Sequence, residues 1–130
     1  MTTELWYLSL TAGFTSLMWV PYILNAMAVR GVMATLGNPR ADAPDLSPWA
    51  ARAKRAHANA IENLVVFAAL VLVASATPVS NDLTVGAAAA YFWSRVAYHF
   101  IYIAGIPVLR TLSFLVGFGC QIALASQLLA

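Results

Sequence analysis

The chain has 130 residues, of which 62% are hydrophobic and 9% are charged, and its mean hydropathy is +0.77. Soluble domains carry roughly 25% charged residues, so this composition excludes a soluble domain and indicates that lipid is the solvent for much of the surface. The net charge of +2 is too small to suggest a nucleic-acid partner, and a single cysteine, Cys120, excludes an internal disulfide framework.

Residues 5–29 form the first predicted membrane span, because this stretch is long enough to cross a bilayer and has no charge before Arg30. Pro21 lies in its interior, where it removes a backbone hydrogen bond and predicts a kink. Residues 30–48 then form the longest polar stretch of the chain, with several proline and asparagine turn signals. They predict the first loop.

The second predicted helix begins after Ser47-Pro48, a pair typical of an N-cap followed by the first helical residue. It runs to residue 76, which is longer than a bilayer requires, so only residues 56–76 are predicted to lie in the membrane. Residues 83–104 and 111–130 form the third and fourth predicted spans, separated by a break at Gly105-Ile-Pro107. In the fourth, Gly117 and Gly119 predict close helix contact. The fold class expected is an all-α membrane bundle of four helices.

The distribution of cations predicts the orientation in the membrane. Of the seven Lys and Arg residues, those in or beside the first loop are Arg30, Arg40, Arg52, Lys54 and Arg55. Arg110 lies in the third loop, whereas the N-terminus and the second loop carry only Glu4 and Asp82. The positive-inside rule therefore places loops one and three in the cytoplasm and both termini on the opposite side.

Two predicted spans carry charges at similar depth in the cytoplasmic half of the membrane. On the second helix, Arg55, Asn59 and Glu62 lie within about 40° of each other on one face. On the third helix, Arg95 lies roughly 13 Å from the cytoplasmic end. A lone charge in hydrocarbon costs several kcal/mol, so we expect Glu62 and Arg95 to pair with each other or with equivalent partners.

A stripe of polar side chains follows the third predicted helix at helical spacing. Its members are Tyr91, Arg95, Tyr98, His99 and Tyr102. Arg30 and Arg110, at the ends of the first and fourth helices, reach the same leaflet. These groups predict a pocket for a small, multiply charged, water-soluble anion, in which arginines bind carboxylates and Glu62 could hold an ammonium group.

Each of these residues also has a purely structural interpretation. Arg52 and Lys54 are best explained as interfacial anchors to anionic lipid, and Tyr91 as a packing residue. Glu62 and Arg95 could form only a structural ion pair that locks the bundle. His57 is expected at a surface or interface, His99 could face a neighbouring helix, and neither histidine shows a recognised metal-ligand spacing, so no metal is expected. Cys120 is expected to be inert.

Residues 55–63, Arg-Ala-His-Ala-Asn-Ala-Ile-Glu-Asn, resemble the R-A-x-x-N-x-x-E signature of the MAPEG family, the membrane-associated proteins in eicosanoid and glutathione metabolism. The similarity extends to Asn38-Pro39, to Arg95-Val-Ala-Tyr98 with Tyr102, and to residues 109–119. The run at 109–119 is most similar to the microsomal glutathione transferase branch.

The resemblance implies a homotrimer of four-helix subunits that binds glutathione at subunit interfaces and acts on hydrophobic electrophiles or lipid hydroperoxides from the bilayer. Carried over by position, the glutathione-binding residues would be Arg30, Arg55, Asn59, Glu62, Arg95, Tyr98 and Tyr102. Arg110 would be catalytic, since a cation beside the sulfur favours the nucleophilic thiolate. The alternative is a non-catalytic protein of the same fold that binds lipid or a membrane partner.

Overall fold

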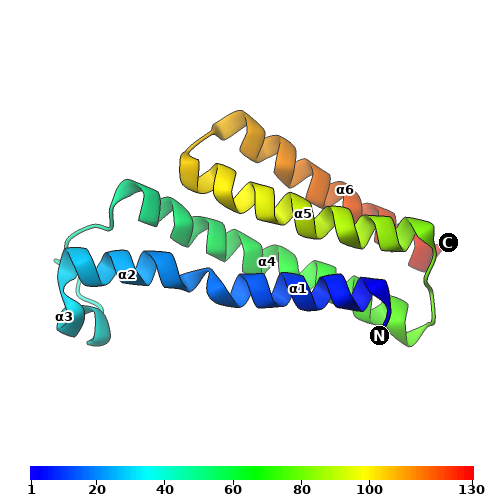
Figure 1. Ribbon diagram of the computed structural model, residues 1–130, viewed down its shortest axis with the longest axis horizontal. Coiled ribbons are helices and arrows are strands. Elements are labelled where there is room, and N and C mark those ends of the chain that lie inside the picture. Colours follow the sequence, from blue (N-terminus) through cyan, green and yellow to red (C-terminus); the bar gives the residue numbers. More distant parts are fainter.

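The computed structural model describes residues 1–130 and contains only α-helices, as the sequence predicts. In chain order they are α1 (Thr3–Leu17), α2 (Trp19–Arg30), α3 (Val32–Leu36), α4 (Pro48–Ala76), α5 (Asp82–Ala104) and α6 (Pro107–Leu129). Figure 1 shows α1 and α2 as one rod beside α4, while α5 and α6 form an antiparallel pair. The four long rods therefore form one bundle, in which α5 contacts α1, α4 and α6.

The first rod is interrupted at Met18, which separates α1 from α2. Pro21 explains this position, because proline has no N–H to donate to the carbonyl of residue 17 and its ring clashes with that group. The N–H of Met18 instead donates to the carbonyl of Thr15 over 3.2 Å, a tighter turn than an α-helix makes. The proline is therefore accompanied by a break in the helical hydrogen bonds, which lies three residues before it.

Helix α4 starts at Pro48, as predicted, but its N-terminus is held differently from the expected cap. The Ser47 side chain makes no capping hydrogen bond to the helix. Instead, Asn25 of α2 clamps Ser47: its amide Nδ2 donates to the Ser47 hydroxyl over 2.9 Å, and its Oδ1 accepts from the Ser47 N–H over 3.0 Å. The start of α4 is thus fixed to α2 and not by its own residues.

Three segments are long and apolar enough to cross a membrane, namely Thr3–Arg30, Pro48–Ala76 and Pro107–Leu129. The third predicted span, α5, begins at Asp82, within one residue of the expected start, but its hydropathy is lower than that of these three segments. Its polar residues explain the difference: Tyr91, Arg95, Tyr98 and His99 are buried between helices, and Tyr102 is half-buried. Helix α6 begins at Pro107, four residues earlier than predicted, since proline fits the first helical turn.

The interior of the bundle is small, as expected for a chain solvated by lipid. Only 25 of the 130 residues are buried, whereas large apolar side chains such as Leu24, Val65 and Ile122 are exposed. The one apolar core cluster joins α4, α5 and α6 through Phe67, Val71, Ala87, Ala88, Tyr91, Cys120 and Leu124. Cys120 lies inside this cluster as a free thiol. The exposed apolar surface indicates contact with lipid or with other chains.

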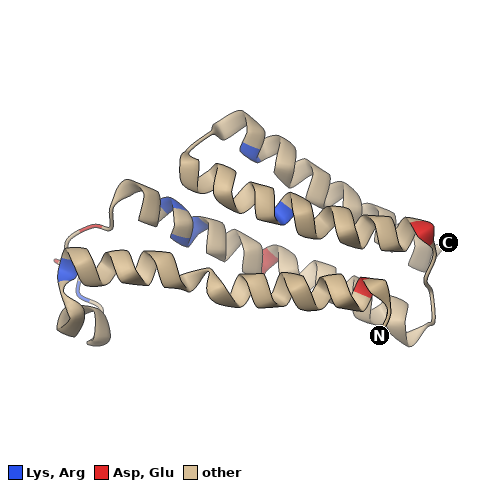
Figure 2. Ribbon diagram, in the orientation of Figure 1, with Lys and Arg blue, Asp and Glu red and all other residues tan.

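The two ends of the bundle differ in charge, because most cations lie with Asp42 and Asp45 at one end and no Lys or Arg lies at the other. Figure 2 shows the Lys and Arg positions in the first loop, in the first turns of α4 and near the α5–α6 turn, with Arg95 midway along α5. Glu4 and Asp82 lie at the opposite end, which carries the N-terminus and the start of α5. The predicted orientation in the membrane depends on this uneven distribution of Lys and Arg.

Gly105, the C-cap of α5, has a structural requirement that predicts the effect of a mutation. Its φ of +81° is left-handed, and a Cβ there would lie 3.4 Å from Cζ of Arg52. We expect Gly105→Ala to destabilise the fold by about 1–2 kcal/mol, measured by thermal unfolding in detergent micelles. Gly86→Ala is the matched control, because a Cβ at that helical position meets nothing within 4 Å. Equal melting temperatures for the two variants would contradict the prediction.

Candidate functional site

The centre of the candidate site is the buried guanidinium of Arg95 on α5, which is 4% exposed. Its Nη2 donates to Oδ1 of Asn59 on α4 over 2.6 Å, and its Cζ lies 4.2 Å from the centroid of the Tyr98 ring. Its Nε has no hydrogen-bond partner in the chain. An amide oxygen and an aromatic face therefore stabilise the cation in place of a carboxylate.

Arg95 and Glu62 form no ion pair within the single chain, and of the two expected alternatives Arg95 has the equivalent partner, Asn59. Glu62 is exposed on α4 and has no salt bridge or hydrogen bond. The one ion pair of the chain joins Arg40 and Asp42 in the first loop. The reason is geometric: Asn59, one turn before Glu62, points at α5 and reaches Arg95 first.

Two side chains that the sequence reasoning did not assign to the site extend the polar contact across the bundle. Nδ2 of Asn63 donates to two oxygens of Asn59: the backbone carbonyl over 2.9 Å and the side-chain Oδ1 over 3.2 Å. Nε2 of Gln121 on α6 donates to the carbonyl of Asn63 over 3.3 Å. Two features of the sequence could have identified these residues. Asn59 and Asn63 have the i, i+4 spacing of neighbours on one helix face, and Gln121 is an amide within the fourth predicted span.

The close approach of α6 to Arg95 depends on Gly117. A Cβ at Gly117 would lie 3.4 Å from the Ser94 hydroxyl and 3.6 Å from Cδ of Arg95. The prediction that Gly117 permits close helix contact is confirmed. Gly119 does not have this role, because a Cβ there would meet nothing within 4 Å. Only one of the two glycines faces the partner helix.

A row of aromatic and cationic groups continues from Arg95 toward the α5–α6 turn. The rings of Tyr98 and Tyr102 lie 5.6 Å apart, edge to face, and Cζ of Arg110 lies 4.7 Å from the Tyr102 ring centroid. Tyr98 is buried, while Tyr102 and Arg110 are half-buried. The structure thus brings Arg95, Tyr98, Tyr102 and Arg110 into one row. Tyr91 does not belong to it, since its ring stacks on Phe67 at 3.9 Å in the core.

Two further predicted site residues, Arg30 and Arg55, lie in a separate cleft where α2, α4 and the first loop meet. Arg30, Lys54 and Arg55 line this cleft of about 480 Å³ together with Asp45. The Nε of Arg30 donates to the carbonyl of Pro44 over 2.7 Å, which leaves its other guanidinium nitrogens without protein partners. Neither Arg30 nor Arg55 forms a hydrogen bond or ion pair with the row on α5 and α6. We call this group the cationic cleft.

Arg52 has a role different from the predicted lipid anchor. Its Nε donates to the carbonyl of Ile103 over 2.8 Å, so it satisfies one of the free carbonyls at the C-terminus of α5. A cation at a helix C-terminus is also stabilised by the helix dipole. Arg52 therefore fastens α4 to α5 beside Gly105. Lys54, by contrast, is exposed.

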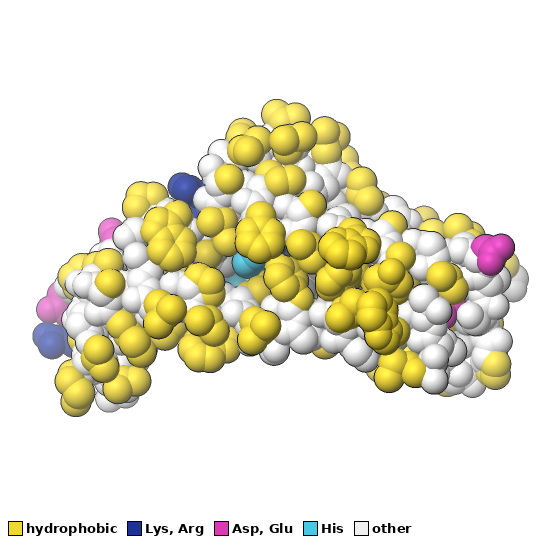
Figure 3. Space-filling model, in the orientation of Figure 1, with side chains coloured by type: hydrophobic (Ala, Val, Ile, Leu, Met, Phe, Trp, Pro, Cys, Tyr) yellow, Lys and Arg dark blue, Asp and Glu magenta, His cyan; other side chains and the backbone are white.

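The two histidines lie away from the Arg95 row. The Tyr22 hydroxyl lies 2.7 Å from Nδ1 of His57. His99 is buried, packs edge to face on Phe14, and borders an apolar hollow of about 160 Å³ beside the α1–α2 break. Figure 3 shows a histidine at the bottom of a depression between apolar side chains. No group of three or more His, Cys, Asp or Glu side chains gathers anywhere in the chain.

Apolar helices with an inward-facing polar row define an integral membrane protein of the α-helical bundle class. The family model of the MAPEG family matches residues 5–130. The chain therefore belongs to the MAPEG family, which includes glutathione transferases and peroxidases as well as non-catalytic members. Among curated proteins and among solved structures, no significant match is found.

Proposed function

We propose that this MAPEG protein is a glutathione-dependent membrane transferase or peroxidase of the microsomal glutathione transferase type. The observation that carries the proposal is Glu62, a carboxylate without a partner on an apolar helix, one turn beyond an asparagine that holds a buried arginine. Such a carboxylate in a membrane span is costly unless a ligand or another subunit completes its environment. The exposed apolar surface around it supports a homotrimer in which neighbouring subunits cover this face.

Glutathione has chemical groups that complement this set of residues. It carries two carboxylates, one ammonium and one thiol, whereas the candidate site offers several guanidinium groups and the free carboxylates of Glu62 and Asp45. In this proposal Arg55 and Arg30 bind carboxylates from the cationic cleft, and Glu62 binds the ammonium. Asn59, Arg95, Tyr98 and Tyr102 bind the remaining polar groups. The subunits of a trimer would bring the cleft and the row together.

Arg110 is the residue proposed to act in the reaction. A guanidinium beside the thiol favours the thiolate, which is the nucleophilic form. In the transferase reaction the thiolate sulfur bonds to an electrophilic carbon, and the leaving group departs with the bonding electron pair. In the peroxidase reaction the sulfur takes the terminal oxygen of a hydroperoxide, and the alkoxide accepts a proton. A second glutathione then reduces the sulfenic acid to give disulfide and water.

Glutathione binding to the purified protein tests the proposal. We expect the wild type to bind glutathione at millimolar concentration by isothermal titration calorimetry, and Glu62→Gln to bind about tenfold more weakly because an ammonium partner is lost. Arg40→Ala is the control, since Arg40 is exposed and pairs only with Asp42. Absence of binding by the wild type would overturn the proposal.

A non-catalytic membrane protein is the second candidate, and one observation favours it. The contacts among Arg95, Asn59, Asn63 and Gln121 already satisfy much of the buried polar surface within one chain. Such a network can hold α4, α5 and α6 together without a ligand. In that case Arg110→Ala would leave every function of the protein intact, whereas the enzyme requires Arg110.

The proposed orientation, with loops one and three in the cytoplasm, makes a separate prediction. We expect Asp42→Cys to react with a membrane-impermeant maleimide only after cells are opened, and Ser80→Cys to react in intact cells. Both positions are exposed, whereas the native Cys120 is buried and serves as the unreactive background. Labelling of the cysteine at position 42 in intact cells would place loop one outside the cytoplasm and would contradict the proposed orientation.

A further inference from the structure

A second polar site lies at the end of the bundle opposite to the cations, and its centre is Glu4. This side chain, in the first turn of α1, is 2% exposed. Its Oε1 accepts hydrogen bonds from the hydroxyls of Thr84 over 2.6 Å and Ser80 over 2.8 Å. Its Oε2 is buried and has no partner in the chain. A carboxylate oxygen in that state requires a donor from elsewhere.

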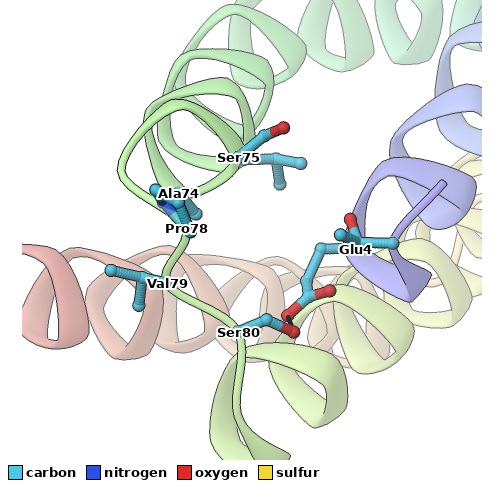
Figure 4. Close-up of a pocket in the computed structure, with 8 residues that line it drawn as sticks. Glu4, Ala74, Ser75, Pro78, Val79 and Ser80 are labelled. Atoms are coloured by element: carbon cyan, nitrogen blue, oxygen red, sulfur yellow. Dashed lines mark hydrogen bonds between the residues drawn. The ribbon is translucent and has the colours of Figure 1, made fainter.

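Glu4 borders a pocket of about 130 Å³ between the start of α1, the end of α4 and the turn before α5. This volume is several times the ~10–15 Å³ that a single water needs. Figure 4 shows the Glu4 side chain extending toward Ser80, with Ser75, Pro78 and Val79 around the pocket. The walls therefore combine hydroxyl groups with short apolar surfaces.

No cationic side chain is available to neutralise Glu4. All seven Lys and Arg residues lie at positions 30–55, 95 and 110, toward the opposite half of the bundle. The nearest other charged residue in this turn is Asp82, which is also acidic. Hydroxyl donors and the N-terminal ends of α1 and α5 stabilise the carboxylate only in part. The remaining cation at this end is the α-ammonium of Met1, which is exposed and forms no ion pair with Glu4, so the free Oε2 is open to an ammonium group from outside the chain.

We propose that the Glu4 pocket binds a primary ammonium group, supplied by the headgroup of an aminophospholipid. Three N–H donors of an ammonium match the free Oε2 and the neighbouring hydroxyl oxygens, and Val71 and Val79 suit the adjoining methylene groups. The pocket lies where three helices begin or end, the depth at which lipid headgroups meet a membrane protein. The site is independent of the proposed glutathione site.

Native mass spectrometry of the detergent-purified protein tests this site with two lipids of identical acyl chains. We expect phosphatidylethanolamine to bind at least about tenfold more tightly than phosphatidylcholine, whose trimethylammonium cannot donate a hydrogen bond. Glu4→Gln should abolish the preference, because the amide keeps an acceptor for Thr84 and Ser80 but loses the charge. Asp82→Asn is the matched control, since it removes one negative charge at the same end outside the pocket, and the preference should remain.

Free ethanolamine distinguishes the two sources of ammonium. Displacement of the lipid by ethanolamine at equal concentration would assign the site to a soluble amine, whereas displacement only at large excess supports the lipid. If Glu4→Gln does not fold, Ser75→Leu fills the exposed side of the pocket without touching the Glu4 hydrogen bonds and should also abolish the preference. Equal binding of the two lipids by the wild type, or a preference retained by Glu4→Gln, would overturn the proposal.

Discussion

Arg95→Ala is expected to destabilise the protein by about 2–5 kcal/mol, the largest effect of any single substitution in the polar row. The change removes the hydrogen bond to Asn59 and the contact with the Tyr98 ring, and leaves a cavity beside Gly117 where the side chain had packed. Thermal unfolding in detergent micelles, followed by circular dichroism, measures the loss. The folded fraction at ambient temperature should fall as well.

Arg95→Met separates packing from charge, because methionine retains most of the apolar stem. We expect it to cost about 1–3 kcal/mol, less than alanine, since Asn59 still has Asn63 as a partner while the guanidinium bonds are lost. Arg40→Ala should change stability by no more than about 1 kcal/mol, as an exposed ion pair contributes little. If both Arg95 variants melted like the wild type, the buried arginine would have no structural role.

Arg110→Ala is expected to lower the turnover of the proposed transferase by about 10²–10³-fold with little change in glutathione binding. The guanidinium is half-buried, lies over the Tyr102 ring and forms no hydrogen bond or ion pair within the chain, so its removal should cost about 1 kcal/mol of stability or less. The ultraviolet difference spectrum of bound glutathione reports the mechanism directly. The thiolate band should be present in the wild type and lost in the variant.

Arg110→Lys provides the matched comparison, because it keeps the charge but changes its geometry. We expect an intermediate thiolate band and partial activity. A thiolate band that persists undiminished in Arg110→Ala would remove Arg110 from the reaction and leave glutathione binding as a separate question. An intact wild-type fold that binds glutathione without forming thiolate would favour the non-catalytic alternative.

The four long helices could be predicted to within a few residues, whereas the short helix α3 (Val32–Leu36) lies in the stretch predicted as the first loop. Hydropathy and turn residues placed the spans, and Pro21 predicted the break in the first. The start of the fourth helix was placed too late because Pro107 was interpreted only as a helix breaker, although proline is also favoured in a first turn. Ser47 is the N-cap residue of α4 as predicted, but its side chain makes no capping hydrogen bond, because a distant residue, Asn25, forms its hydrogen bonds.

The candidate site was predicted as a set of residues but not as a set of contacts. Helical periodicity correctly placed Asn59 and Glu62 near one face of α4, yet a difference of one turn decided which of them meets Arg95. Arg52 was interpreted from its charge and its place near the membrane surface. Its contact with the Ile103 carbonyl depends on the approach of α4 to α5, which no local pattern contains.

The sequence alone was sufficient to predict that lipid surrounds much of this protein, where its long helices lie and toward which end its cations gather. These properties depend on composition and on periods of a few residues. The sequence also contained the signature by which the chain belongs to the MAPEG family. Only the tertiary structure decided that Arg95 pairs with Asn59 and that Glu62 remains without a partner. The burial of Glu4 beside Thr84, residues far apart in the chain, was decided at the same level. A buried polar group takes whichever partner packing brings within hydrogen-bond distance, and packing is a property of the whole fold.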